Sequence, residues 1–151
     1  KIKQAESYYQ QAIDLKPNIS FYYRRLGDVF NRQGEFDLAI LNYKKAISLS
    51  PKIAYFYVHL GSSLAKQNKL DEAIQSCQQA IELNPENANF HYILGNIQLQ
   101  KGDVDEAFAS YQQAIQLNPQ QMKKIFSQIS VVIKEKTQVY LHIHEREPQL
   151  V

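Results

Sequence analysis

Four prolines are evenly spaced along the chain, each 34 residues after the one before: Pro17, Pro51, Pro85 and Pro119. Three glycines keep the same step, at Gly27, Gly61 and Gly95, and two rows of alanines follow it as well. A fixed period of this length indicates an array of repeated units, because one unit cannot bury its own apolar face and must stack on its neighbours. Such arrays usually present a binding surface, so we expect binding rather than catalysis.

One period, residues 20–53, contains two apolar stripes at helical spacing, with Gly34 between them. Pro51 closes the unit, because proline lacks the amide hydrogen that a continuing helix needs. We therefore predict a pair of helices in each period, with further copies in residues 54–87 and 88–121. The stripes of the first copy are Tyr23, Leu26 and Phe30, then Phe36, Ala39, Ile40, Tyr43, Ala46 and Ile47. The second stripe of the third copy is Val104, Ala107, Phe108, Tyr111, Ala114 and Ile115.

The position between the two stripes is held by Gly34, Asn68 and Gly102. Glycine with asparagine as its substitute predicts a left-handed backbone at this turn. Acidic residues follow directly, at the start of each second helix, where the helix dipole favours negative charge. The glycines and alanines within the stripes predict that the two helices of each pair approach closely.

The first copy resembles the pattern of the tetratricopeptide repeat family. The matching residues are Tyr23, Leu26, Gly27, Phe30, Ala39, Tyr43 and Pro51. The resemblance implies an all-α fold, a right-handed superhelix of antiparallel helix pairs. Three residues depart from the pattern. Cys77 and His91 replace aromatic residues, and Gln98 replaces a large apolar one. We expect the third copy to pack less tightly, or Leu99 to turn inward instead.

The repeat positions divide the chain into six segments. Residues 1–19 match the second-helix half of a truncated repeat, and residues 20–53, 54–87 and 88–121 are whole repeats. Residues 122–136 are predicted to form a capping helix, and residues 137–151 a tail or linker. The capping stripe is Ile125, Phe126, Ile129, Val132 and Ile133. Because Lys1 opens inside a repeat, we expect the sequence to be a fragment.

In the family that the repeats resemble, ligands lie inside the superhelix, along the first helices of successive repeats. Arginine and tyrosine often carry binding energy at interfaces, and cations on a concave surface attract acidic segments. We therefore expect a protein-interaction module whose groove binds a peptide, with an acidic peptide as the specific interpretation and ordinary solvated helix faces as the alternative. The groove residues are Phe21, Arg24, Arg25, Asp28 and Arg32, then Tyr55, His59, Ser62 and Lys66, then Asn89, Tyr92, Ile93 and Asn96.

Two specialised binding modes of the family are not reproduced. A clamp for a carboxyl terminus would need asparagine in place of Asp28, and an asparagine ladder would need it in place of Arg25, His59 and Ile93. The alternative function is the non-catalytic arm of a larger bacterial transferase, a glycosyltransferase or a methyltransferase.

The sequence offers no catalytic set, so we expect neither an enzyme nor a cofactor in this chain. His142 and His144 would share one face of a strand, but without a third ligand we interpret them as a polar face and not a metal site. A net charge of +2 is too small for nucleic-acid binding, and no apolar run could span a membrane. The single cysteine, Cys77, fits a reducing compartment, so we expect a cytoplasmic protein. The uncovered half-repeat predicts weak self-association.

Overall fold

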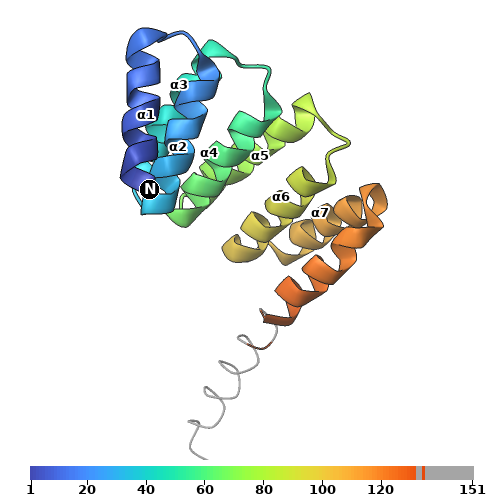
Figure 1. Cartoon of the computed structure of the whole chain (residues 1–151). Coiled ribbons are helices and arrows are strands. Elements are labelled where there is room, and N and C mark those ends of the chain that lie inside the picture. The colour runs from blue at the N-terminus through green and yellow to red at the C-terminus, as the bar shows by residue number, and fades with distance from the viewer. Residues whose placement is uncertain (132–133, 135–151) are drawn as a thin grey trace, which may run out of the picture.

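The computed structural model describes residues 1–131 and 134 of the 151-residue chain. This part is built of helices throughout, arranged as an extended stack (Figure 1). Residues 122–131 are also helical. The other elements are α1 (Ile2–Leu15), α2 (Ser20–Gln33), α3 (Phe36–Leu49), α4 (Ala54–Lys66), α5 (Leu70–Leu83), α6 (Ala88–Lys101), α7 (Val104–Leu117) and the 3-10 helix η1 (Pro119–Gln121).

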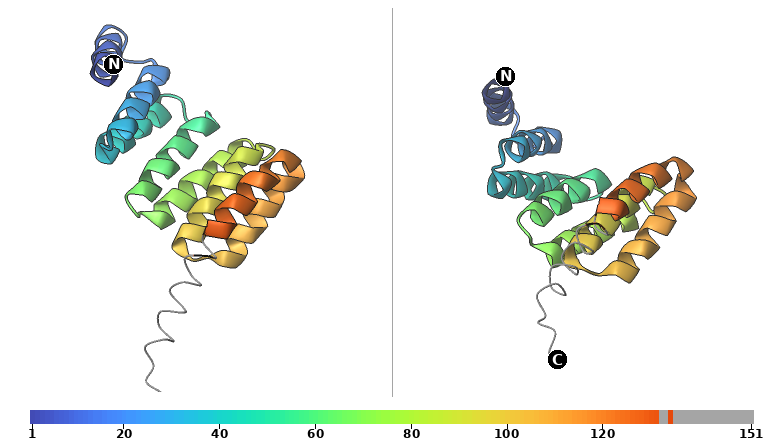
Figure 2. Two further views of the ribbon diagram at one scale, coloured as in Figure 1. Left: turned by 60° about the horizontal axis from the view of Figure 1, so that its bottom comes forward. Right: turned by 90° about the horizontal axis from the view of Figure 1, so that it is seen from below.

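Each helix packs against the next one along the chain, and the first helices α2, α4 and α6 also contact one another in order. Figure 2 shows the same succession from two further directions, with α1 at one end of the stack and the helix of residues 122–131 at the other. The predicted all-α superhelix of antiparallel helix pairs is therefore confirmed.

The turn inside each pair has the left-handed backbone that the sequence predicts. The φ angle is 81° at Gly34, 60° at Asn68 and 97° at Gly102. Glycine adopts this conformation without a steric penalty, and asparagine tolerates it better than most residues. These turns reverse the chain, so the second helix of each pair packs back against the first.

The stripe glycines make room for a side chain of the second helix. A Cβ atom on Gly27 would lie 2.6 Å from Cε1 of the Tyr43 ring, and one on Gly95 would lie 2.6 Å from Cε1 of Tyr111. In the middle repeat a Cβ on Gly61 would meet the sulfur of Cys77 at 2.9 Å. The predicted close approach is thus confirmed, and in the two outer repeats it is made through an aromatic ring.

The alanine rows lie at the centre of each helix pair. Ala39, Ala73 and Ala107 are all 0% exposed, and the second row is equally buried in the three whole repeats. The same repeat positions in α1, Ala5, Tyr9 and Ala12, are only half-buried. This difference arises because no first helix covers that face of α1 in the described chain.

A repeated hydrogen bond ties each first helix to the proline that ends the unit before it. The hydroxyl groups of Tyr23 and Tyr57 donate to the carbonyl oxygens of Pro17 and Pro51, each at 2.9 Å. His91 takes the same place, with Nε2 2.8 Å from the Pro85 carbonyl. Because a carbonyl only accepts, this contact fixes Nε2 as the protonated nitrogen. His91 therefore departs from the family pattern but keeps its hydrogen bond.

Gln98, which also departs from the family pattern, is accommodated in the third repeat by a polar contact. Gln98 stays buried at 8% exposure, and the Ser110 hydroxyl donates a hydrogen bond to its Oε1 at 2.6 Å. Leu99 is half-buried and packs against the cluster of Ala107, Tyr111, Ala114 and Ile125. The position thus holds a satisfied amide, and Leu99 supplies apolar contact beside it.

Three residues of the predicted apolar stripes are exposed, and one of them, Val104, is 37% exposed. Phe108 is 50% exposed, whereas Ile40, at the same repeat position, is buried in the central core cluster. Phe126 is 62% exposed, although its neighbour Ile125 is buried. The two phenylalanines lie at the end of the stack, where fewer described helices follow to cover them.

Some expectations concern residues outside the described part of the chain: Val132, Ile133, the tail 137–151, His142 and His144. Among the described residues, no helix combines the length and apolar character needed to cross a bilayer.

Candidate functional site

All the predicted groove residues lie on α2, α4 and α6, which are neighbours in the stack. We call the side chains at these positions the first-helix surface. They are held in register because each helix begins after the same kind of turn and is fixed to its partner through the buried alanine rows. The structure brings part of the set into contact and leaves the rest separate.

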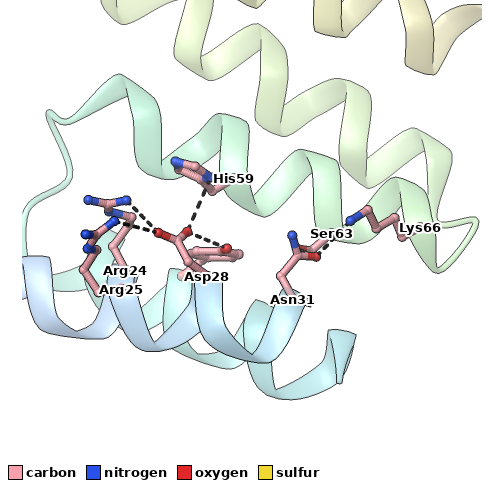
Figure 3. Close-up of polar contacts among 8 residues, drawn as sticks. Arg24, Arg25, Asp28, Asn31, His59, Ser63 and Lys66 are labelled. Atoms are coloured by element: carbon pink, nitrogen blue, oxygen red, sulfur yellow. Dashed lines mark hydrogen bonds and ion pairs between the residues drawn. The ribbon is translucent and has the colours of Figure 1, made fainter. Parts of the chain in front are cut away.

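Asp28 on α2 is the centre of a polar cluster (Figure 3). Its Oδ2 lies 2.7 Å from Nη1 of Arg24 and 3.8 Å from Nη1 of Arg25. Its Oδ1 accepts a hydrogen bond from the Tyr43 hydroxyl at 3.0 Å and lies 3.7 Å from Nδ1 of His59 on α4. One carboxylate therefore links α2, α3 and α4.

Burial and the charge of Asp28 shift the pKa values of two of its partners, Tyr43 and His59. Burial, helped by the Asp28 charge, raises the pKa of Tyr43 far above its usual value. Burial lowers the pKa of His59, although Asp28 opposes this change and Arg24 adds to it. The imidazole of His59 is stacked on the Tyr43 ring at a centroid distance of 5.5 Å. The cluster is thus a packed junction between the first two whole repeats.

Two exposed aromatic side chains lie on the same face as this cluster. Phe21 is 48% exposed, and the guanidinium groups of Arg24 and Arg25 lie 5.0 Å and 5.6 Å from the centroid of its ring. Tyr55, at the same repeat position on α4, is 54% exposed and accepts a hydrogen bond from the Asn87 amide. Aromatic rings that face solvent, as both of these do, and that carry cations, as Phe21 does, are suited to contacts with a partner.

A second polar group lies farther along α2 and α4 (Figure 3). The Ser63 hydroxyl donates to Oδ1 of Asn31 at 3.2 Å, and the Lys66 ammonium donates to the same atom at 3.4 Å. Lys66 also lies 5.4 Å from the centre of the Phe36 ring. The structure thus separates Lys66 from the arginines. Arg32 is exposed and Ser62 is half-buried.

The third repeat has the same framework without the charges. The Tyr111 hydroxyl donates to Oδ1 of Asn96 at 2.8 Å, as Tyr43 does to Asp28. Burial, and to a lesser extent Tyr92, raises the pKa of Tyr111 to about 12. Tyr92 is half-buried, and the ammonium of Lys124 lies 5.2 Å from its ring centre. Ile93 is half-buried and Asn89 exposed.

Sequence reasoning missed Tyr43, Asn31 and Ser63 as parts of this surface. The repeat pattern places Tyr43 in the core, yet its hydroxyl also reaches the carboxylate of Asp28, 15 positions earlier. The same separation joins Tyr111 to Asn96. A comparison of polar residues at this spacing would have found both hydrogen bonds.

The contacts on this surface are ion pairs, cation–aromatic pairs and hydrogen bonds. Among the described residues, no three histidine, cysteine or acidic side chains come together in a way that could hold a metal ion. Burial raises the pKa of the Cys77 thiol to about 12, so this sulfur stays protonated at neutral pH. The cation–aromatic pairs and the hydrogen-bonding amides instead suit contacts with another chain.

A hollow of about 320 Å³ is lined by residues of α3, α4 and α5. Tyr57, Leu60 and Leu64 of α4 contribute apolar lining, and Lys44 of α3 and Glu72 of α5 contribute charges. Lys44 and Glu72 lie on second helices, so these charges provide controls for the first-helix surface.

Comparison with known proteins supports the repeat assignment. Models described as tetratricopeptide repeat match residues 58–121 and 1–19, and one described as TPR repeat matches residues 27–68. No curated protein sequence matches the chain.

Solved structures of MamA are similar to this chain. One crystal structure of MamA has 26% identity and a TM-score of 0.79, over 90% of this chain and 79% of that one. MamA residues 41 to the end from Desulfovibrio magneticus RS-1 have 24% identity and a TM-score of 0.74, over 80% of this chain and 68% of that one. A third, MamA MSR-1 C2, has 23% identity and a TM-score of 0.69, over 79% and 68%. The latter two are informative for the fold alone.

Proposed function

Because the chain belongs to the tetratricopeptide repeat family, we propose that its first-helix surface binds a segment of a partner protein. The repeats and the likeness to MamA make the chain a protein-interaction scaffold. The finer assignment, that the partner lies along α2, α4 and α6 and is acidic, is the proposal. The transferase-arm alternative stays a prediction, since no contact described above favours it.

The observation that carries the proposal is the exposed aromatic row with its cations. Phe21 and Tyr55 occupy the same position on successive first helices and are each about half exposed. Arg25 is 43% exposed and lies against the Phe21 ring. Large rigid aromatics and arginine are the side chains that most often carry binding energy. They are already positioned, so little conformational entropy would be lost on binding.

An acidic partner is favoured by the uneven engagement of the two arginines. Arg24 is in close contact with Asp28 at 2.7 Å, so that carboxylate largely satisfies it. Arg25 lies at 3.8 Å and is more exposed, so it can pair with a second carboxylate. Asp28 thus reduces the positive charge that the sequence alone suggests and leaves Arg25 as the main anchor.

The test is a titration with a fluorescent synthetic peptide rich in glutamate, followed by anisotropy. Arg25→Glu should weaken binding several-fold, because attraction becomes repulsion, and the double variant with Arg24→Glu should weaken it more. Lys44→Glu reverses one charge on the second-helix face and should change the affinity little. Equal losses from Arg25→Glu and Lys44→Glu would show that the first-helix surface is not the binding site.

We also propose weak self-association through α1, where Ala5, Tyr9 and Ala12 are only half-buried. Tyr8, on the same helix, is 66% exposed. Exposed apolar area of this kind tends to meet another surface. Sedimentation velocity over a concentration series should show a rising average mass, which Tyr9→Glu should remove. A monomer at every concentration would contradict this proposal.

A further inference from the structure

Cations stacked on aromatic rings occur at both ends of the first-helix row. At one end, Arg24 and Arg25 of α2 lie over Phe21. At the other end, Lys124, from the helix of residues 122–131, lies over Tyr92 of α6. Lys124 is exposed, so its ammonium can meet a partner and the ring at once.

Between these two ends, the positions on α4 and α6 that match Arg24, Arg25 and Asp28 carry no charge. Arg32 of the first-helix surface lies seven residues beyond Arg25 on α2, at the same repeat position as Lys66. On α4, His59 is kept neutral at neutral pH, because its burial lowers its pKa. On α6, Ile93 is half-buried, and Asn96 holds the place that Asp28 has on α2. The cation of α4, Lys66, lies seven residues beyond His59, which is roughly 10 Å along a helix, where it binds Asn31 and covers Phe36.

The two cationic ends act as separate sites in solution. Neighbouring packed helices lie roughly 8–10 Å apart, so three steps from α2 to the last helix span about 24–30 Å. The Debye length is about 8 Å at physiological ionic strength. Each end is therefore screened from the other, and a partner must bring one acidic group to each of them.

Resting on the binding function proposed above, we propose that this surface recognises a protein segment with two acidic groups separated by an uncharged stretch. One group would pair with Arg25 over Phe21 and the other with Lys124 over Tyr92. An extended chain advances about 3.3 Å per residue, so the two groups would lie about 7–9 residues apart. The uncharged stretch would cross His59 and Asn96, where no cation offsets the desolvation of a carboxylate.

Linking the two contacts strengthens both. Once the first acidic group binds, the second is held near its site at a high effective concentration, provided that the spacing matches. A segment with its acidic groups clustered together can occupy one end only. Spacing, rather than total charge, would therefore decide which acidic partners bind well.

The experiment uses synthetic fluorescent peptides of equal composition, each with two glutamate pairs separated by an increasing number of glutamine and serine residues. Anisotropy titrations should show the tightest binding at a separation of about 7–9 residues. Arg25→Gln or Lys124→Gln should each weaken that peptide, by up to about fivefold for one exposed ion pair. Either variant should also remove the dependence on spacing, whereas Lys44→Gln should retain it. All three substitutions are at exposed positions, and circular dichroism checks that each variant stays folded.

The outcomes separate this inference from the function on which it rests. Binding that is equally tight at every spacing, or that does not respond to Lys124→Gln, would overturn the two-ended recognition and leave the first-helix surface as a simple binding site. If no peptide binds, or if Lys44→Gln weakens binding as much as Arg25→Gln, the proposed binding function fails as well.

Discussion

The first and third whole repeats share one framework but differ in charge. In both, a glycine of the first helix makes room for a tyrosine ring, and the tyrosine hydroxyl donates back to a polar side chain on that helix. In the first repeat the acceptor is Asp28, which also holds two arginines. In the third it is Asn96, and Tyr92 and Ile93 stand where the arginines would be. The glycine–tyrosine packing and its hydrogen bond are therefore common to both repeats, whereas the charged side chains at the acceptor and arginine positions are found only in the first of these two.

If the framework is truly shared, enlarging its glycine should have the same large effect in both repeats. Gly27→Leu and Gly95→Leu should each lower the free energy of unfolding by about 3 kcal/mol, because the new side chain would overlap a buried ring. Gly61→Leu should also be costly, since its Cβ would meet the backbone oxygen of Ala73 at 3.0 Å. Urea unfolding followed by circular dichroism measures all three. An unchanged midpoint in any of them would contradict the repeat alignment there.

Removing the tyrosine hydroxyl should lower the free energy of unfolding by different amounts in the two repeats. Tyr43→Phe should cost about 1.5 kcal/mol, because the hydroxyl donates to a charged and partly buried carboxylate. Tyr111→Phe should cost only about 0.5–1 kcal/mol, since its acceptor is the neutral Asn96 amide. The same unfolding assay gives both values. Equal costs would mean that the charge of Asp28 adds nothing to this hydrogen bond.

Exchanging the acceptors should change binding more clearly than stability. Asp28→Asn removes the charge from the acceptor of the Tyr43 hydroxyl and the carboxylate from two partly exposed arginines, which together should cost about 1 kcal/mol of stability. The freed arginines should then bind an acidic peptide more tightly, by up to about fivefold. Asn96→Asp should have the opposite effect on affinity. Weaker peptide binding by Asp28→Asn would instead show that the carboxylate is needed to position the arginines.

The smallest expected effect is a pH dependence at the first junction, where His59 lies. Burial lowers the pKa of His59 in the folded chain, so the unfolded chain binds the proton more readily. The resulting stability is present above the unfolded pKa of about 6.5 and is lost as the pH falls below it. The urea midpoint should therefore drop between pH 7 and pH 5, and His59→Gln should reduce that drop. The matched variant Ile93→Gln, at the same position on α6, should leave the drop unchanged.

The fold could be predicted almost entirely from spacing, because each repeat position carries one steric demand. The left-handed turn requires the residues found at Gly34, Asn68 and Gly102. The close approach of a ring or a sulfur requires glycine at the stripe positions. The exposed Phe108 and Phe126 could not be predicted in this way, since periodicity marks an apolar residue without saying whether a following helix covers it.

The contacts of the candidate site were less predictable than its location. Spacing places Arg24, Arg25 and Asp28 on one face, but it does not reveal that the carboxylate already engages both cations. His91 illustrates the same limit, because it departs from the family pattern yet makes the same contact to a proline carbonyl as Tyr23 and Tyr57. Hydrogen bonds depend on the positions of the side-chain donor and acceptor atoms in space. A repeat pattern gives only the identity of the residue at each repeat position.

The buried thiol of Cys77 can report how often the middle repeat opens. It is the only cysteine in the chain, it is fully buried, and burial raises the pKa of its thiol to about 12. A thiol reagent can therefore modify it only when the central helix pair opens, so the rate of labelling reports how often that opening occurs. In a linear array each unit is supported by its neighbours, and loss of a distant end would appear as faster labelling at this one sulfur. Damage at either end of the stack could thus be followed at its centre, without adding a probe.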